Sequence, residues 1–197
     1  MAIAFRCRCG SLQGEVEPAQ AYARAICYCR DCQAGARALG DPSRVLDANG
    51  GTDIIATRPS ALRFTSGAGQ LACLSLSPRG LLRWHAACCG TPIANTPRSP
   101  RLAYAGLVTA ILEAPADDID AAFGPARTVL NAESATGDVR GTPLLAFIGI
   151  LRILRGLAAA RLGGGHRRNP FFQLGVPVRA PRVLSLEERE SAEGAQC

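Results

Sequence analysis

The sequence contains no lysine, so all 22 of its basic residues are arginine, and aromatic residues make up only 5% of the chain. The missing lysine excludes a phosphate-binding loop at Gly163 to Gly165, because that motif needs a lysine followed by serine or threonine. Hydrophobic residues still make up 48% of the chain, which is enough for a core, but a mostly aliphatic one. A length of 197 residues fits one domain with an extension, or two small domains.

Two kinds of targeting segment are also missing. The first nine residues run from Met1 into arginine and cysteine without an apolar region, so we expect no secretory signal. The best apolar run begins at Leu144 but meets Arg152 and then Arg155, whereas a membrane span needs about 18 or more residues with few charges. We therefore expect a cytoplasmic protein without a transmembrane span, in which the thiols stay reduced.

Short strand-like runs, separated by glycine and proline, follow one another through the first part of the chain. This spacing predicts a mainly β fold with an antiparallel sheet over residues 1–135. The composition becomes polar and small near residues 131–142, and Pro143 to Leu162 then reads as a helix with proline in its first turn. We expect residues 136–197 to form a basic, helical C-terminal extension, of which Phe171 and Phe172 pack against the main domain.

Seven of the nine cysteines fall into three tight groups: Cys7 and Cys9, then Cys27, Cys29 and Cys32, then Cys88 and Cys89. In a cytosolic chain such groups are more often metal sites than disulfides. Thiolates bind zinc in a tetrahedron at about 2.3 Å. The first and third groups can therefore together form a four-ligand zinc site that links distant parts of the core. Of the other two cysteines, we expect Cys73 to be a core residue and Cys197 a free, exposed thiol.

The middle group offers three thiolates, Cys27, Cys29 and Cys32, within six residues. Three protein ligands with one open position are typical of a catalytic zinc site, in which water or a substrate thiolate takes the fourth place. The alternatives are a second closed structural site, or a group of thiols without metal. No histidine lies near this group in the sequence, and Asp31 is the local candidate for a general base.

The order of these motifs, which ends in Cys89-Gly90-Thr91-Pro92, resembles the glutathione-dependent formaldehyde-activating enzyme family, to which centromere protein V also belongs. The resemblance covers about residues 3–130, whereas the C-terminal part looks like an uncharacterised bacterial subgroup. It implies a small β-rich, β-tent-like domain built around zinc. The implied activity is that of a carbon–sulfur lyase, similar to S-(hydroxymethyl)glutathione synthase, which reversibly joins a thiol to a small aldehyde.

The resemblance also implies a role for each cysteine. Cys7, Cys9 and Cys89 are the implied structural zinc ligands. Cys27, Cys29 and Cys32 are the implied reactive residues, which hold a second zinc or meet the thiol of glutathione.

One departure from the family pattern leaves the fourth structural ligand open. The third motif of the family is normally Cys-x-x-Cys-Gly, but here Ala86 stands in place of its first cysteine. Cys88 can supply the missing sulfur if the chain kinks locally, because adjacent residues of a strand point to opposite faces. His85 is the other candidate, through a ring nitrogen.

The segment from Arg140 to Arg182 holds eight arginines and no acidic residue. Such a segment can contact nucleic acid or anionic lipid, or it can be a solvated or internally paired basic face, which we favour. Its helix, with Arg152 and Arg155 on one side, can also lie at a subunit interface or on a membrane surface. One competing function is a non-catalytic zinc module that binds a partner through this extension. Another, which rests on the cysteines, is a thiol redox or metal sensor. The sequence does not indicate an oligomeric state.

Overall fold

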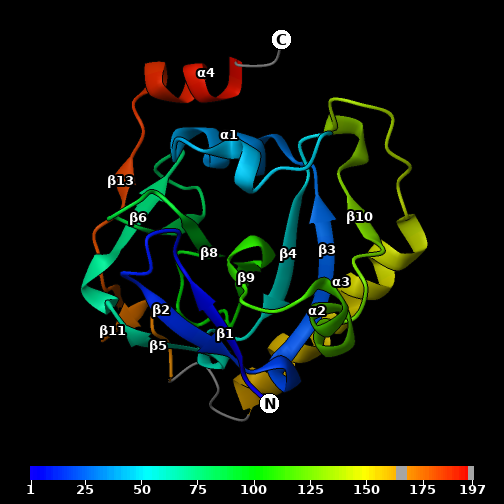
Figure 1. Cartoon of the computed structure of the whole chain (residues 1–197), viewed down its shortest axis with the longest axis horizontal. Helices are drawn as coiled ribbons and strands as arrows, with labels where there is room; N and C mark the ends of the chain where they lie inside the picture. Colours follow the sequence, from blue (N-terminus) through cyan, green and yellow to red (C-terminus); the bar gives the residue numbers. More distant parts are fainter. Residues whose placement is uncertain (163–167, 195–197) are drawn as a thin grey trace.

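Figure 1 shows the computed structural model, which describes residues 1–162 and 168–194. The expectations for Gly163 to Gly165 and for Cys197 lie outside these residues. The fold is mainly β, as predicted, with thirteen strands and four α-helices in the described part of the chain. The strands are β1 (Ile3–Arg6), β2 (Gln13–Val16), β3 (Ala21–Cys27), β4 (Thr52–Thr57), β5 (Leu62–Ser66), β6 (Leu71–Ser75), β7 (Leu82–Ala86), β8 (Pro92–Thr96), β9 (Ala105–Val108), β10 (Thr128–Leu130), β11 (Phe172–Gln173), β12 (Val176–Pro177) and β13 (Arg182–Val183). The helices are α1 (Arg30–Ala38), α2 (Ala116–Phe123), α3 (Pro143–Leu162) and α4 (Leu186–Gly194).

Most strands belong to one eight-stranded sheet in the order β10-β3-β4-β9-β8-β7-β6-β13. Neighbouring strands run antiparallel inside this sheet, whereas the edge pairs, β10 with β3 and β13 with β6, are parallel. A second, antiparallel sheet has the order β1-β2-β5, and β11 and β12 form a short ribbon. The predicted antiparallel arrangement is therefore confirmed inside the sheets, whereas nothing in the local sequence indicates the parallel edges.

The main core is a single buried cluster that joins both large sheets. Phe5 of the three-stranded sheet belongs to it together with Trp84, Ile93 and Leu107 of the eight-stranded sheet. Phe171, from the C-terminal part of the chain, is fully buried and stacks on Trp84 with 5.1 Å between the ring centroids. The expected packing of this aromatic pair against the main domain is thus confirmed for Phe171, and Phe172 is also buried in the cluster.

Two helices lie across one end of the eight-stranded sheet. In Figure 1, α1 lies along the upper end of the strands and α4 lies above it. Ala34 of α1 and Ala192 of α4 share a second buried cluster with Leu74, Leu76 and Leu184. The C-terminal helix α4 therefore packs on the outer side of α1, and the inner side of α1 faces the ends of the strands.

The long helix α3 begins and ends at the predicted residues, Pro143 and Leu162. It lies beside β3 and β10 at the edge of the molecule (Figure 1), with Gly156 so close to the ring of Tyr22 that a Cβ there would overlap it. Among the described residues it is the one helix whose length and composition would let it cross a membrane, which by itself is weak evidence. The predicted absence of a transmembrane span stays a prediction.

Candidate metal centres

Four cysteines from two distant turns meet at one point, which we call the four-sulfur group: Cys7, Cys9, Cys88 and Cys89. Their sulfur atoms all lie within 4.8 Å of one another. Cys9 Sγ is 3.2 Å from Cys88 Sγ, and Cys7 Sγ is 3.5 Å from Cys9 Sγ and 3.8 Å from Cys88 Sγ. A tetrahedron with arms of about 2.3 Å has edges of about 3.8 Å, so these separations suit a metal of the size of zinc.

Each turn of the four-sulfur group closes on a glycine with a left-handed backbone. Gly10 has φ +77° and donates its N–H to the carbonyl of Cys7 at 2.9 Å. Gly90 has φ +71° and donates to the carbonyl of Ala86 at 2.8 Å. Because a Cβ at Gly90 would stand 2.6 Å from the carbonyl oxygen of Leu39, no other residue fits this turn without a shift.

The kink that the sequence required for Cys88 is present. Strand β7 ends at Ala86, so Cys88 and Cys89 lie in a turn instead of on opposite faces of a strand. Of the two candidates for the fourth ligand, Cys88 lies within the four-sulfur group and His85 does not. His85 instead has its Nδ1 3.4 Å from the carbonyl oxygen of Arg83, and burial lowers its pKa.

Neighbouring hydrogen bonds favour the thiolate form of Cys9 and Cys89, whereas burial and contacts with the neighbouring thiols raise the pKa of Cys88 to about 12. Hydrogen bonds with the side chain and backbone of Ser11 lower the pKa of Cys9 to about 6. The N–H of Leu12 donates to Cys7 Sγ at 3.3 Å, and the hydroxyl oxygen of Thr91 lies 3.0 Å from Cys89 Sγ. Neither Ser11 nor Thr91 was predicted from the sequence, although both lie directly beside a cysteine motif.

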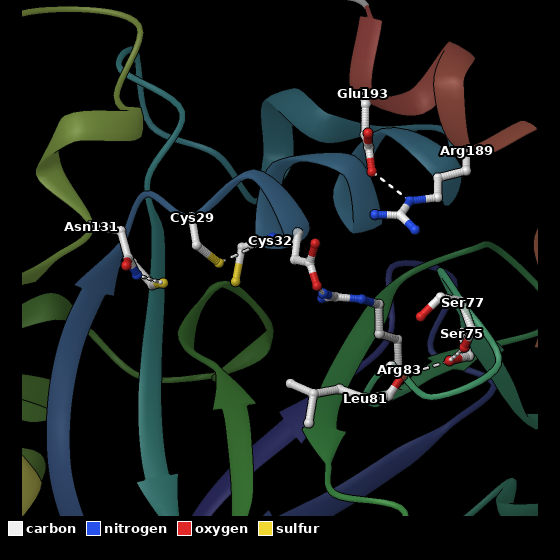
Figure 2. Close-up of polar contacts among 12 residues, drawn as sticks. Cys29, Cys32, Ser75, Ser77, Leu81, Arg83, Asn131, Arg189 and Glu193 are labelled. Atoms are coloured by element: carbon white, nitrogen blue, oxygen red, sulfur yellow. Dashed lines mark hydrogen bonds and ion pairs between the residues drawn. The ribbon is translucent and has the colours of Figure 1, made fainter. Parts of the chain in front are cut away.

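The middle cysteines form a second cluster, the three-sulfur group, with all three sulfur atoms within 4.8 Å of one another. Cys27 is the last residue of β3, Cys29 caps the N-terminus of α1, and Cys32 lies in the first turn of that helix. The N–H of Cys32 donates to Cys29 Sγ at 3.4 Å, so the thiol takes the place of the usual capping oxygen (Figure 2). The N-terminal end of the helix dipole favours negative charge on these sulfurs.

Asn131 contacts the three-sulfur group and was not predicted from the sequence. Its side-chain amide donates to Cys27 Sγ at 3.4 Å, and its backbone is left-handed at φ +54°. Hydrogen bonds with Cys29 and Cys32, and then this amide, lower the pKa of Cys27, whereas the same thiol contacts raise the pKa of Cys32. The contact spans 104 residues of sequence and depends on the parallel pairing of β10 with β3, so no local sequence pattern predicts it.

A cavity of about 20 Å³ lies beside Cys32, between α1 and the strands, and Thr52 and Arg83 also line it. Both residues are buried, and neither Thr52 Oγ1 nor Arg83 Nε has a hydrogen-bond partner among the described residues. The nearest carboxylate is that of Asp31, 3.9 Å from the guanidinium. Gly35 makes room for Arg83, because a Cβ there would stand 2.9 Å from the guanidinium. The cavity is large enough for about one water-sized group.

A hollow of about 470 Å³ lies beside the four-sulfur group, and not beside the three-sulfur group. Its charged lining consists of Arg6, Arg8 and Arg44 with Asp41 and Glu113. All three arginines are ion-paired there, to Glu113 at 2.6 Å and to Asp41 at 3.0 and 2.8 Å. Because these exposed charges pair with one another, the lining of the hollow does not indicate which ligand it would bind.

Comparison with known proteins gives a family but no activity. A model of a family of unknown function, DUF6151, matches residues 1–181. No curated protein matches the chain. Among solved structures, the crystal structure of a Rhodobacter sphaeroides protein is 25% identical over 59% of this chain and 94% of that chain, with a TM-score of 0.41.

Proposed function

Because this chain belongs to DUF6151, a family of unknown function, its activity has to be inferred from its own residues, and we propose that it is a zinc-dependent carbon–sulfur lyase. Its substrates are a small-molecule thiol such as glutathione and a small aldehyde, which it joins reversibly into an S-hydroxyalkyl adduct. The motif order shared with the formaldehyde-activating family supports this proposal, as does the β-rich fold built around the cysteine turns.

The observation that carries the proposal is the three-sulfur group at the start of α1. It offers three protein ligands, and among the described residues no fourth cysteine, histidine or carboxylate joins it. The four-sulfur group, in contrast, offers a complete tetrahedral set. Structural zinc sites use four protein ligands and catalytic sites use three, so the two groups suit different roles.

The donor chemistry of both groups fits zinc, because thiolates are among the ligands that this ion prefers and the sulfur separations suit its size. Cys7, Cys9, Cys88 and Cys89 hold the structural ion of the proposal, and Cys27, Cys29 and Cys32 hold the reactive one. Zinc at the reactive site supplies Lewis acidity and keeps a coordinated thiol deprotonated at neutral pH.

In the proposed reaction the sulfur of the thiol substrate attacks the aldehyde carbon, so a C–S bond forms as the C=O π bond breaks. The electron pair moves to the oxygen, which takes up a proton, while the proton of the thiol is released to solvent. Arg83 and Thr52 donate hydrogen bonds to this oxygen from the cavity beside Cys32. The amide of Asn131 and the N-terminus of α1 stabilise the negative charge that the sulfurs share.

The test is to measure zinc content and thiol–aldehyde adduct formation on protein purified without added metal. We expect about two zinc ions per wild-type chain, and about one, with adduct formation lost, in Cys29→Ser. Cys73→Ser is the matched control, because Cys73 is buried but lies outside both sulfur groups. A wild type with one zinc, unchanged in Cys29→Ser and without adduct formation, would contradict the proposal.

A non-catalytic zinc module is the second candidate, and one observation favours it. The helix of the basic extension, α3, exposes large apolar side chains beside arginines, as a surface for a partner does. This candidate predicts that the thiols of the three-sulfur group are unreactive toward aldehydes, and that the role of the chain lies in what α3 contacts.

A further inference from the structure

The outer face of α3 carries a row of large apolar side chains that no other described element covers. Leu144 is 70% exposed, Phe147 58%, Leu151 43% and Leu154 55%. Their spacing of three and four residues places them on one side of the helix. Apolar faces of this kind on a folded protein mark interaction sites.

The inner face of α3 is already occupied by its own protein. Gly149 and Ala160 are buried, and Gly156 lies against the ring of Tyr22 on β3. The start of the helix is also attached to β10, because the hydroxyl of Thr142 accepts a hydrogen bond from the N–H of Val129 at 2.8 Å. The helix is therefore apolar on both sides, and only its inner side is covered.

Beside this row lies a hollow of about 340 Å³ whose lining includes Arg127 and Arg152 together with Leu145 and Ile148. The side chains of Arg127 and Arg152 make no ion pair with the described residues, whereas Arg24, at the same hollow, is paired with two aspartates. Residues 139 to 186 include no acidic residue at all. Two arginines without an ion pair among the described residues thus line the same hollow as Leu145 and Ile148, which are also partly exposed.

We propose that α3 and this hollow form a docking surface for an anionic phospholipid bilayer, with the helix lying in the plane of the interface. Phe147, Leu151 and Leu154 enter the boundary between headgroups and acyl chains. Arg127 and Arg152 meet the phosphate groups of the lipids, as basic residues do at anionic membrane surfaces.

The charge distribution favours a bilayer over a second copy of this chain. A twofold contact through α3 would bring Arg152 and Arg155 of both copies onto one interface, and the segment has no carboxylate to pair with them. An anionic bilayer supplies that negative charge. The packing of the inner face against β3 and β10 keeps the helix with its own sheets, which is why it lies on the bilayer and does not cross it.

The experiment is cosedimentation of the full chain with vesicles of phosphatidylcholine alone or mixed with phosphatidylglycerol. We expect binding to the mixed vesicles that weakens with added salt. Arg127→Gln with Arg152→Gln should lower the affinity roughly 25-fold, since each basic residue near such a surface is worth roughly fivefold. Phe147→Gln with Leu151→Gln should abolish binding. The matched controls are Arg79→Gln and Leu174→Gln, which are exposed elsewhere and should leave binding unchanged.

Three results would overturn the proposal. The first is no sedimentation with mixed vesicles. The second is bound protein that resists extraction at alkaline pH, because the helix would then cross the bilayer. The third is a dimer by light scattering that Phe147→Gln with Leu151→Gln dissociates, because a second copy would then cover α3. Thermal unfolding of each variant checks that it is folded, and none of these outcomes depends on lyase activity.

Discussion

Arg83 is a buried cation that is only partly paired with hydrogen-bond acceptors and negative charge. Its side chain is 6% exposed, its Nε lacks a partner among the described residues, and its nearest carboxylate is 3.9 Å away. We expect Arg83→Met to keep zinc content and fold, because replacing a poorly paired buried charge by an apolar side chain is often neutral or stabilising. Adduct formation should fall by roughly 100-fold or more in kcat, as for the loss of one preorganised donor.

The measurement that checks this is steady-state adduct formation with zinc analysis of the same samples. Thr52→Val is the companion variant, because it removes the other unpartnered donor of the cavity at nearly constant shape. An unchanged kcat in Arg83→Met, with two zinc ions retained, would remove Arg83 from the proposed site.

Asn131 allows the pH response of the three-sulfur group to be tested on its own. Asn131→Gly keeps a residue that tolerates the left-handed backbone but removes the amide that donates to Cys27. Because this hydrogen bond lowers the pKa of Cys27, its loss should raise that pKa. The pH of half-maximal alkylation of metal-free protein should move upward. The shift should be partial, since the contacts with Cys29 and Cys32 contribute more. A downward shift would contradict the assigned direction.

At the scale of elements, the two turns of the four-sulfur group differ in the space around their glycines, because only Gly90, between β7 and β8, lies against another part of the chain. We expect Gly90→Ala to lower stability and zinc retention more than Gly10→Ala, although both glycines have positive φ. The left-handed backbone costs either alanine about 1–2 kcal/mol. Only at Gly90 would the added methyl group also meet a carbonyl oxygen, that of Leu39, at 2.6 Å. Denaturant midpoints and zinc content measure the difference, and equal losses in the two variants would show that the contact with Leu39 is unimportant.

Elements with a local signature could be predicted from the sequence, and elements made by distant pairing could not. The helix Pro143–Leu162 and the cysteine turns follow from proline, glycine and spacing in short windows. Cys88 was ambiguous because its ligand geometry depends on where β7 ends, which the sequence alone does not fix. Asn131 contacts Cys27, and Thr52 and Arg83 line the cavity beside Cys32. These residues come from separate strands or strand ends, so only the assembled sheet brings them together.

At the scale of the whole molecule, the four-sulfur group connects the two large sheets. Cys7 and Cys9 follow β1 of the three-stranded sheet, whereas Cys88 and Cys89 follow β7 of the eight-stranded sheet. The cysteines of the three-sulfur group, in contrast, lie within six residues of one another. A metal in the first group therefore links distant parts of the chain, and one in the second fixes only the join of β3 and α1.

The fold also depends on the C-terminal region, which a truncation after residue 135 tests. Phe171 is fully buried against Trp84, and β13 pairs with β6, so a chain ending at 135 would uncover both. Because truncating a buried phenylalanine to alanine alone costs about 3–5 kcal/mol, we expect the shortened chain to unfold at a clearly lower temperature or to aggregate. Phe171→Ala in the full chain is the matched variant and should reproduce much of the loss. If residues 1–135 instead bind zinc and melt cooperatively at the temperature of the full chain, they form an independent domain and the C-terminal region serves only its partner.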